Sequence, residues 1–284
     1  MKKLTYILLV TLIFASCKKS GEDLLFDRKP ETRMLERNAE FKAKLLESPN
    51  GWKAYMRTSL YGGAFAFYMR FNDQEQVSML SDWSSSYATN FRTSTYRIQY
   101  VMNTSLIFDT YTYISRMMDP DSDVNGGYKA DGLRSDIEFE YVRSSTDTLF
   151  LRGKKYGNYL YLIKANPEEE AVFNEKKYWE NISKTSSFLN KSGKYIEVPY
   201  EGQQVKINLT FYTRTTDKTV YSRVVLADKT TLTNDAGFAF GLDEVYLYNP
   251  IKIAGYTFVK IKLKSENNYV ALDEQGKEYP ILFP

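Results

Sequence analysis

Two residue counts limit the chemistry that this chain can perform. The sequence contains no histidine and one cysteine, Cys17. Without histidine there is no general base for Ser-His-Asp or Cys-His nucleophile systems, and no histidine pair for catalytic zinc. What remains is carboxylate, lysine or tyrosine chemistry, oxygen-ligated metals and non-catalytic binding. Most enzyme classes are therefore excluded, and no cofactor is expected beyond a candidate calcium ion.

The single cysteine occupies a position at which bacteria attach lipid to exported proteins. Lys2 and Lys3 precede an uncharged apolar run over residues 4–14 that is too short to cross a bilayer. Phe14-Ala15-Ser16-Cys17 then resembles the bacterial lipobox. We expect residues 1–16 to be a signal peptide and Cys17 to carry diacylglycerol and palmitate as a membrane anchor. The alternative is an ordinary secretory signal in which the cysteine has no role.

A short acidic motif is the candidate metal site. Asp121, Asp123 and Asn125 alternate before Gly126, as at the start of a calcium loop, where alternate side-chain oxygens converge on a hard cation. Position twelve of such a loop would be Gly132 instead of the glutamate that an EF-hand requires. The alternative is a polar hairpin loop, because Asp, Asn and Gly are turn formers.

Aromatic residues in a Ser/Thr-rich segment form the candidate ligand-binding site. Trp83, Tyr87 and Phe91 lie in a stretch that is expected to be a loop, where exposed rings could stack on a sugar or hold a peptide. The alternative is that these rings fold down onto the core.

Alternating carboxylates, together with Asp109 at a predicted strand end, are the candidates for acid catalysis. Asp136, Glu138 and Glu140 share one face of a predicted strand, where like charges could raise a pKa as paired-acid hydrolases require. Alternation with apolar residues equally predicts a solvated strand face, which is the preferred interpretation.

The elements that must position these residues are mainly strands. A helix is predicted from Pro30 to Ser48, with Leu35, Ala39 and Ala43 at helical spacing. From Trp52 the period changes to two, and about eight short strands follow without a helix between them. A second helix is predicted after Asn166, its N-cap, with more strands behind it.

These elements predict a mainly β (α+β) fold of antiparallel meander lobes, each a barrel or a sandwich, with an N-terminal helix and a linking helix. The expected division is a signal peptide over 1–16, a lipidated tether over 17–29, a first β lobe with its helix over 30–165, and the linking helix with a second lobe over 166–284. Residues 63–67 (GAFAF) and 237–240 (GFAF) look faintly alike, which leaves open whether the lobes are duplicates.

Several segments together resemble a family of Bacteroidetes-type lipoproteins whose domain has no known function. The segments are Phe26-Asp27 with Pro30 and Arg33, Leu45-Leu46, Asn50-Gly51-Trp52, Gly62-Gly63 with Phe67 and Phe71, residues 106–111, 136–139 and 149–154, and Tyr248-Asn249-Pro250 with Gly255. The resemblance implies a place beside TonB-dependent nutrient-uptake systems of the outer membrane. It brings no catalytic residues.

The leading hypothesis is therefore a non-catalytic accessory or ligand-binding lipoprotein of such an uptake system. We expect it to be lipid-anchored to the bacterial outer membrane, on its periplasmic or its cell-surface side, with a glycan or peptide ligand and uptake-system proteins as partners. The alternatives are a carboxylate-dependent glycan hydrolase and a structural envelope subunit. Nucleic acid is not an expected partner, because the formal net charge is only +3 and no basic block follows the first residues.

Overall fold

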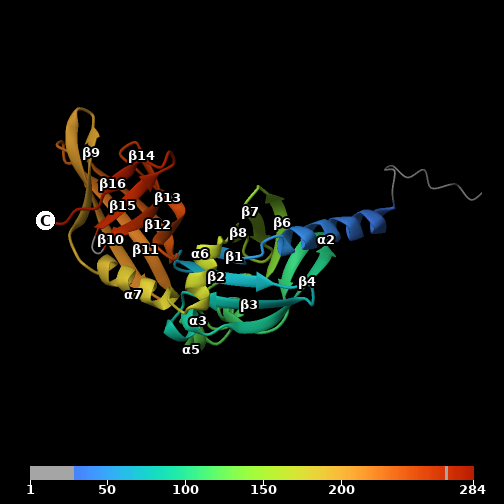
Figure 1. Ribbon diagram of the computed structural model, residues 1–284. Coiled ribbons are helices and arrows are strands. Elements are labelled where there is room, and N and C mark those ends of the chain that lie inside the picture. Colours follow the sequence, from blue (N-terminus) through green and yellow to red (C-terminus); the bar gives the residue numbers. More distant parts are fainter. Residues whose placement is uncertain (1–28, 266–267) are drawn as a thin grey trace, which may run out of the picture.

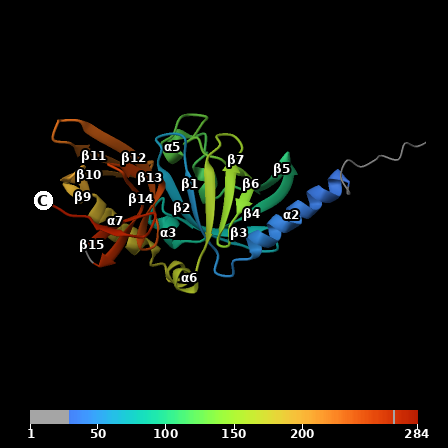
Figure 2. The ribbon, with the colours of Figure 1, turned by 90° about the horizontal axis from the view of Figure 1, so that it is seen from above.

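Antiparallel strands are the main regular structure in the computed structural model, which describes residues 29–265 and 268–284. Two β lobes lie side by side along the long axis of the molecule (Figures 1 and 2). The mainly β fold predicted from the sequence is confirmed. Cys17 and the predicted signal peptide lie outside the described residues. Within the described residues no helix is both long enough and apolar enough to span a bilayer.

The first lobe is a closed barrel in which the eight strands follow one another in chain order. β1 pairs with β2 on one side and with β8 on the other, so the barrel has no free edge. Alternate residues such as Trp52, Ala54 and Met56 fill its interior. The strands are β1 Trp52–Arg57, β2 Ala64–Phe71, β3 Gln76–Ser81, β4 Arg92–Val101, β5 Asn103–Phe108, β6 Glu138–Ser144, β7 Thr148–Gly153 and β8 Tyr159–Lys164.

Helix α2 (Pro30–Leu46) precedes the barrel and packs against β4 and β5. Pro30 stands in its first turn, as predicted. The helix buries Phe41 and Leu45, and the indole of Trp52 donates a hydrogen bond to the Leu45 carbonyl at 2.9 Å. Leu35, one of the residues that predicted this helix, is 70% exposed.

Three one-turn helices interrupt the first eight strands, although none was predicted there. They are α3 (Ser85–Thr89), α4 (Tyr113–Arg116) and α5 (Ser122–Asn125). Local caps hold them in place: Thr112 and Ser115 form a capping box on α4, and Asp121 caps α5. Such helices are shorter than the window in which helical periodicity can be recognised.

The predicted linking helix is two helices, α6 (Pro167–Asn174) and α7 (Tyr178–Leu189). Asn166 is the N-cap of α6 and Pro167 its first residue, as predicted. The prediction of one continuous helix was wrong, because Lys176 adopts a left-handed backbone with φ 60° between the two. That conformation ends one helix and redirects the chain into the next.

The second lobe repeats the meander in a sheet that almost closes. Its strands are β9 Lys194–Tyr200, β10 Gln203–Arg214, β11 Asp217–Val225, β12 Thr231–Phe240, β13 Glu244–Ile253, β14 Tyr256–Ser265, β15 Asn268–Asp273 and β16 Glu278–Pro280. They pair in chain order, and Tyr195 exchanges two backbone hydrogen bonds with Leu282 beyond β16. Helix α7 closes the core of this lobe with Tyr178, Ile182 and Phe188.

The two similar sequence segments meet each other at the lobe interface. Residues 63–67 run into β2, the second strand of the first lobe, whereas residues 237–240 end β12, the fourth strand of the second lobe. These positions are not equivalent, so the likeness does not support a duplication. It reflects close approach: a Cβ atom on Gly237 would lie 2.3 Å from the Gly62 carbonyl oxygen.

A buried ion pair joins the lobes at this contact. Asp82, directly after β3, accepts from the Lys218 ammonium of β11 at 2.6 Å and from the Phe240 backbone N–H at 3.0 Å. Both charged side chains are almost fully excluded from solvent. The Lys218 ammonium also lies 4.3 Å from the centre of the Phe65 ring. Burial lowers the pKa of Lys218, and the Asp82 carboxylate opposes that shift.

Replacing Lys218 tests this pair as the link between the lobes. Lys218→Met leaves the Asp82 carboxylate buried without its counter-ion, so the free energy of unfolding should fall by about 3–5 kcal/mol. Chemical denaturation measures the change. The control is Lys206→Met, which removes an exposed pair with Glu197 at 3.7 Å and should cost less than about 1 kcal/mol. Equal effects of the two substitutions would contradict the assignment.

A second prediction concerns pH. Lys194 is buried at the start of β9, where its ammonium donates to the Leu189 carbonyl at the end of α7 at 2.8 Å. Burial, together with Lys191, lowers its pKa to about 8. From about pH 8 to pH 10 the unfolded chain therefore holds a proton that the folded chain has lost, and stability contributed by this residue rises with pH. We expect the difference in the free energy of unfolding between the native chain and the Lys194→Met variant to increase from about pH 8 to pH 10. Chemical denaturation of both proteins at several pH values measures this difference.

Candidate functional site

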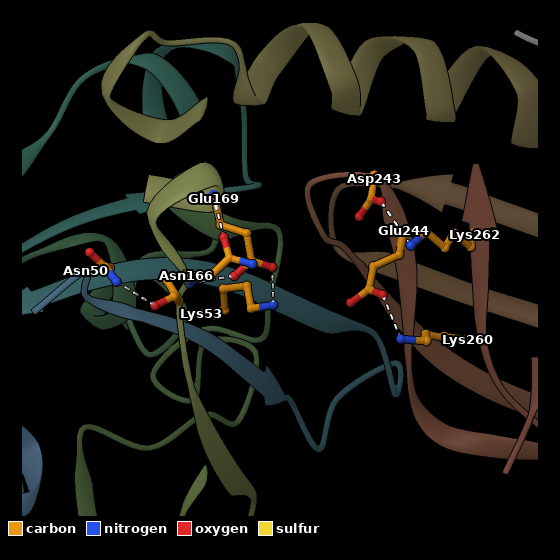
Figure 3. A network of polar contacts seen from close by, with 9 residues as sticks. Asn50, Lys53, Asn166, Glu169, Asp243, Glu244, Lys260 and Lys262 are labelled. Atoms are coloured by element: carbon orange, nitrogen blue, oxygen red, sulfur yellow. Dashed lines mark hydrogen bonds and ion pairs between the residues drawn. The ribbon is translucent and has the colours of Figure 1, made fainter. Parts of the chain in front are cut away.

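A polar cavity of about 480 Å³ lies between the two lobes. Figure 3 shows the charged side chains on its two sides. Its lining comes from β1, α6, α7, the β12–β13 turn, β13 and β14, so neither lobe forms it alone. The lining residues are Lys53, Asn166, Glu168, Glu169, Val172, Asn181, Leu242, Asp243, Glu244, Lys260 and Lys262.

The first wall is built on the start of α6. Asn166 and Glu169 form a reciprocal capping box: each side chain accepts a hydrogen bond from the other's backbone N–H, at 2.8 and 3.0 Å. The second carboxylate oxygen of Glu169 accepts from the Lys53 ammonium of β1. The cap therefore fixes the carboxylate, and the carboxylate positions the lysine.

The second wall is a tight turn with two lysines beside it. Gly241 N–H donates to the Glu244 carbonyl at 2.8 Å, and a Cβ atom on Gly241 would lie 2.8 Å from Glu244 Cγ. Lys260 pairs with Glu244 at 3.2 Å, and Lys262 pairs with Asp243 at 3.5 Å. These lysines alternate on β14, so both ammonium groups lie on the cavity side of that strand.

Two tyrosine rings stack beside the cavity and connect its walls. Tyr55 of β1 and Tyr246 of β13 have ring centres 3.9 Å apart and planes 11° apart. Burial, and after it the nearby Glu244 carboxylate, raises the pKa of Tyr55 well above its ordinary value. Burial likewise raises the pKa of Tyr246. Both phenols are therefore neutral near pH 7 and act as packing surfaces.

This arrangement suits recognition of a polar ligand. Lysine and asparagine side chains offer donors, carboxylates offer acceptors, and both kinds are present on both walls of the cavity. A hydroxyl group can satisfy both kinds at once. Glu169 and Glu244 lie on opposite walls, and each is paired with a lysine. A larger hollow of about 720 Å³ lies on the second lobe alone, between α7 and β14–β15.

The structure brings two of the three predicted aromatic residues together. The Arg116 guanidinium lies over the Trp83 ring at 5.0 Å and donates to the Tyr87 hydroxyl at 2.7 Å. Both rings pack against the first core, and Tyr87 stacks on Tyr113. The segment expected to be a loop contains α3.

Phe91 lies apart from that pair. It is partly exposed next to Arg70, whose guanidinium is 5.3 Å from the ring centre. Trp83, Tyr87 and Phe91 are not among the residues that line the interlobe cavity.

The predicted calcium motif forms a local turn. Asp121 accepts from the Asp123 N–H at 3.0 Å as the cap of α5. Asn125 is buried, and its amide donates to the carbonyls of Arg116 and Asp119, both at 2.9 Å. Nowhere in the described parts of the chain do three or more acidic, cysteine or histidine side chains gather in a way that could hold a metal ion.

Asp136 belongs to the architecture of the barrel. It is buried, and its carboxylate accepts from the backbone N–H groups of Lys155 and Tyr156 at 2.7 and 3.0 Å. It therefore anchors the turn between β7 and β8. Glu138 is exposed, and Glu140 accepts from Asn103 at 3.0 Å.

Sequence reasoning missed the cavity residues. Lys53, Lys260 and Lys262 alternate with apolar residues, as on any solvated strand face, and nothing in the sequence distinguishes them. The one available signal was the capping box of Asn166 and Glu169 at the predicted start of α6. This capping box shows where α6 begins, but it does not show that the second lobe faces the start of that helix.

Replacing Asp136 tests its structural role. Asp136→Ala leaves two N–H groups without a charged acceptor, so the free energy of unfolding should fall by about 3 kcal/mol. The matched control on the same segment is Glu138→Ala, expected within about 0.5 kcal/mol of the native chain. Thermal or urea unfolding checks both values. A mild effect at Asp136 would reopen its interpretation as an acid held for catalysis.

Comparison with solved structures gives weak likenesses. A protein with unknown function from the DUF3598 family of Nostoc punctiforme is 8% identical, with 81% of this chain and 92% of that chain covered and a TM-score of 0.20. Kievitone hydratase from Nectria haematococca is 8% identical, with 83% of this chain and 89% of that chain covered and a TM-score of 0.18. These scores are too low to carry an argument about fold or function.

Comparison with curated proteins gives no match. A family model described as a domain of unknown function, DUF4302, matches residues 22–265, which include α2, the whole first barrel and most of the second lobe. This chain belongs to the DUF4302 family of domains of unknown function.

Proposed function

We propose that this protein is a lipid-anchored lipoprotein of the bacterial outer membrane that binds a hydroxyl-rich ligand, a glycan, in the interlobe cavity. It would serve as a non-catalytic accessory component of a nutrient-uptake system. The observation that carries the binding role is the cavity itself, whose paired lysines and carboxylates come from both lobes. The anchor and the uptake context are supported by the motif ending at Cys17 and by the resemblance described from the sequence.

A glycan fits this lining better than an apolar ligand does. Ligand pockets for drug-sized apolar molecules are lined mainly by hydrophobic side chains. Here only Val172 and Leu242 are apolar among the lining residues. A charged ligand would have to compete with ion pairs that are already formed, whereas sugar hydroxyls can add hydrogen bonds to both partners of each pair.

Hydrolysis is the second candidate, because Glu169 and Glu244 stand on opposite walls of one cavity. A glycosidase needs one carboxyl group as a proton donor and another as nucleophile or base. Each of these glutamates is paired with a lysine, and this pairing favours a binding role over hydrolysis. The hydrolase would be favoured if the native chain released reducing sugar from a bound glycan and the Glu244→Gln variant did not.

Calorimetric titration of the full chain in detergent against glycan and peptide panels tests the proposal. Lys53→Met removes one donor from the first wall and should weaken glycan binding about tenfold, the effect of one hydrogen bond to a charged group. The control is Lys264→Met, on the same strand as Lys260 and Lys262 but lining the other hollow. It should leave the affinity unchanged. Natively folded protein that binds no glycan at millimolar concentration would refute the proposal, and peptide binding alone would reassign the ligand.

A further inference from the structure

Four exposed aliphatic side chains gather at the end of the first lobe that lies away from the second lobe. Six large aliphatic residues are exposed among the described residues, and four of them are Leu35, Val101, Met102 and Val142. We call these four the α2 shoulder. Leu35 comes from α2, Val101 and Met102 from the β4–β5 hairpin tip, and Val142 from β6. In both ribbon views α2 extends from the first barrel away from the second lobe (Figures 1 and 2).

These residues come from three elements that contact one another. The Thr104 hydroxyl donates to Asn38 of α2 at 2.9 Å, which holds the base of the hairpin tip against the helix turn that follows Leu35. Asn103 and Val142 line a hollow of about 240 Å³ beside α2. Val101, Met102 and Asn103 line the neighbouring hollow of about 550 Å³. Asn103 belongs to both, so Val101, Met102 and Val142 lie around one continuous surface, and the Thr104–Asn38 hydrogen bond places α2 beside it.

Met102 is the residue least expected at its position. It is 89% exposed, and its φ of 66° lies in the left-handed region that favours glycine. An exposed apolar side chain on an unfavourable backbone gains nothing from the fold. The fold therefore leaves this apolar side chain free for contact with a partner outside the chain.

The charge around the shoulder is positive. Arg152, Lys154, Lys155, Arg37 and Lys44 line the two hollows, against Glu138, Glu140 and Glu40. Cationic side chains beside exposed apolar ones are the pattern of a surface that binds anionic lipid.

The chain outside the described residues limits how far the membrane can be. Eleven residues separate Cys17 from Lys29, so a fully extended tether reaches at most about 40 Å from the acylated residue to the start of α2. Leu35 lies within two turns of that start. The shoulder is therefore on the same side of the molecule as the start of α2, where the tether joins, and the second lobe is on the other side (Figures 1 and 2).

We propose that the α2 shoulder docks onto an anionic phospholipid bilayer, with Met102 and Leu35 entering the interface and the neighbouring lysines and arginines contacting headgroup phosphates. This inference rests on the lipid anchor of the proposed function. It fixes the orientation of the protein: the first lobe lies on the membrane and the second lobe points away from it.

Fluorescence of a probe at the hairpin tip tests the docking. Met102→Cys and Lys229→Cys each place one reactive thiol in the lipidated full chain, because Cys17 is then acylated. The residues are matched, since Lys229 is an exposed turn residue of the second lobe with φ 70°. Each variant is labelled with an environment-sensitive dye and placed in vesicles of phosphatidylethanolamine and phosphatidylglycerol that carry nitroxide lipids.

The dye at position 102 should shift to the blue and be quenched about threefold more strongly than the dye at 229, as expected for a group within the headgroup region. Phosphatidylcholine in place of phosphatidylglycerol should reduce that difference. In a third variant, a dye at Leu35→Cys should lose quenching when Met102→Gly is added. Gly suits the left-handed backbone, so this last change should leave folding intact.

Three outcomes would overturn the docking, and they can be told apart. Lipidated protein that floats with the vesicles, but whose dye at 102 behaves like the dye at 229, overturns the docking and leaves the anchor standing. Mass spectrometry that finds Cys17 without acyl groups overturns the anchor, and the docking with it. A blue shift at 102 that appears in detergent without vesicles, together with a dimer by sedimentation, assigns the shoulder to a second copy of the chain and also overturns the docking.

Discussion

The relation between the two lobes depends on one buried ion pair, Asp82 with Lys218. Taking both charges out of water costs several kcal/mol per ion, and the pair repays this only while each group keeps its partner. Asp82 also accepts from the backbone of Phe240, so the carboxylate is tied to two strands of the other lobe. Such a pair adds little net stability, but it strongly disfavours any lobe arrangement that separates the charges. It therefore acts as a constraint on orientation.

The cavity follows from that constraint. Its walls belong to different lobes, and Tyr55, whose ring stacks on Tyr246, is close both to Asp82 of the ion pair and to the carboxylates Glu169 and Glu244 of the cavity. A change in the angle between the lobes would alter the distance between Lys53 and Glu244 before it disturbed either barrel core. The close approach of Gly237 to the Gly62 carbonyl also restricts the angle between the lobes, because no larger residue fits there. Ligand geometry is thus set by the lobe contact.

The sequence predicted the parts whose signals are local. Alternation from Trp52 onward reflects strands with one buried face, and Asn166-Pro167 carries its own capping chemistry, so both were correct. The break at Lys176 was not visible, because a left-handed lysine has no sequence signature. Asp82 and Lys218 were missed for a different reason. Each looks like an ordinary charge at a strand end. They become partners only because β2, to which Asp82 is hydrogen-bonded through Ala66, packs against β11 and β12.

Leu35 shows that a helical pattern does not reveal what an apolar residue contacts. Leu35 contributed to the helical pattern of α2, yet the helix buries Phe41 and Leu45 and leaves Leu35 in solvent. An apolar residue at helical spacing indicates a surface that is covered by another apolar surface, but the pattern does not identify that second surface. In a free protein that cover is the core, whereas in a tethered protein it can be the membrane. With the lobes held rigidly, contact at the α2 shoulder would also fix the interlobe cavity at a set height above the bilayer. Anchor, shoulder and ion pair would then together determine where a ligand is presented.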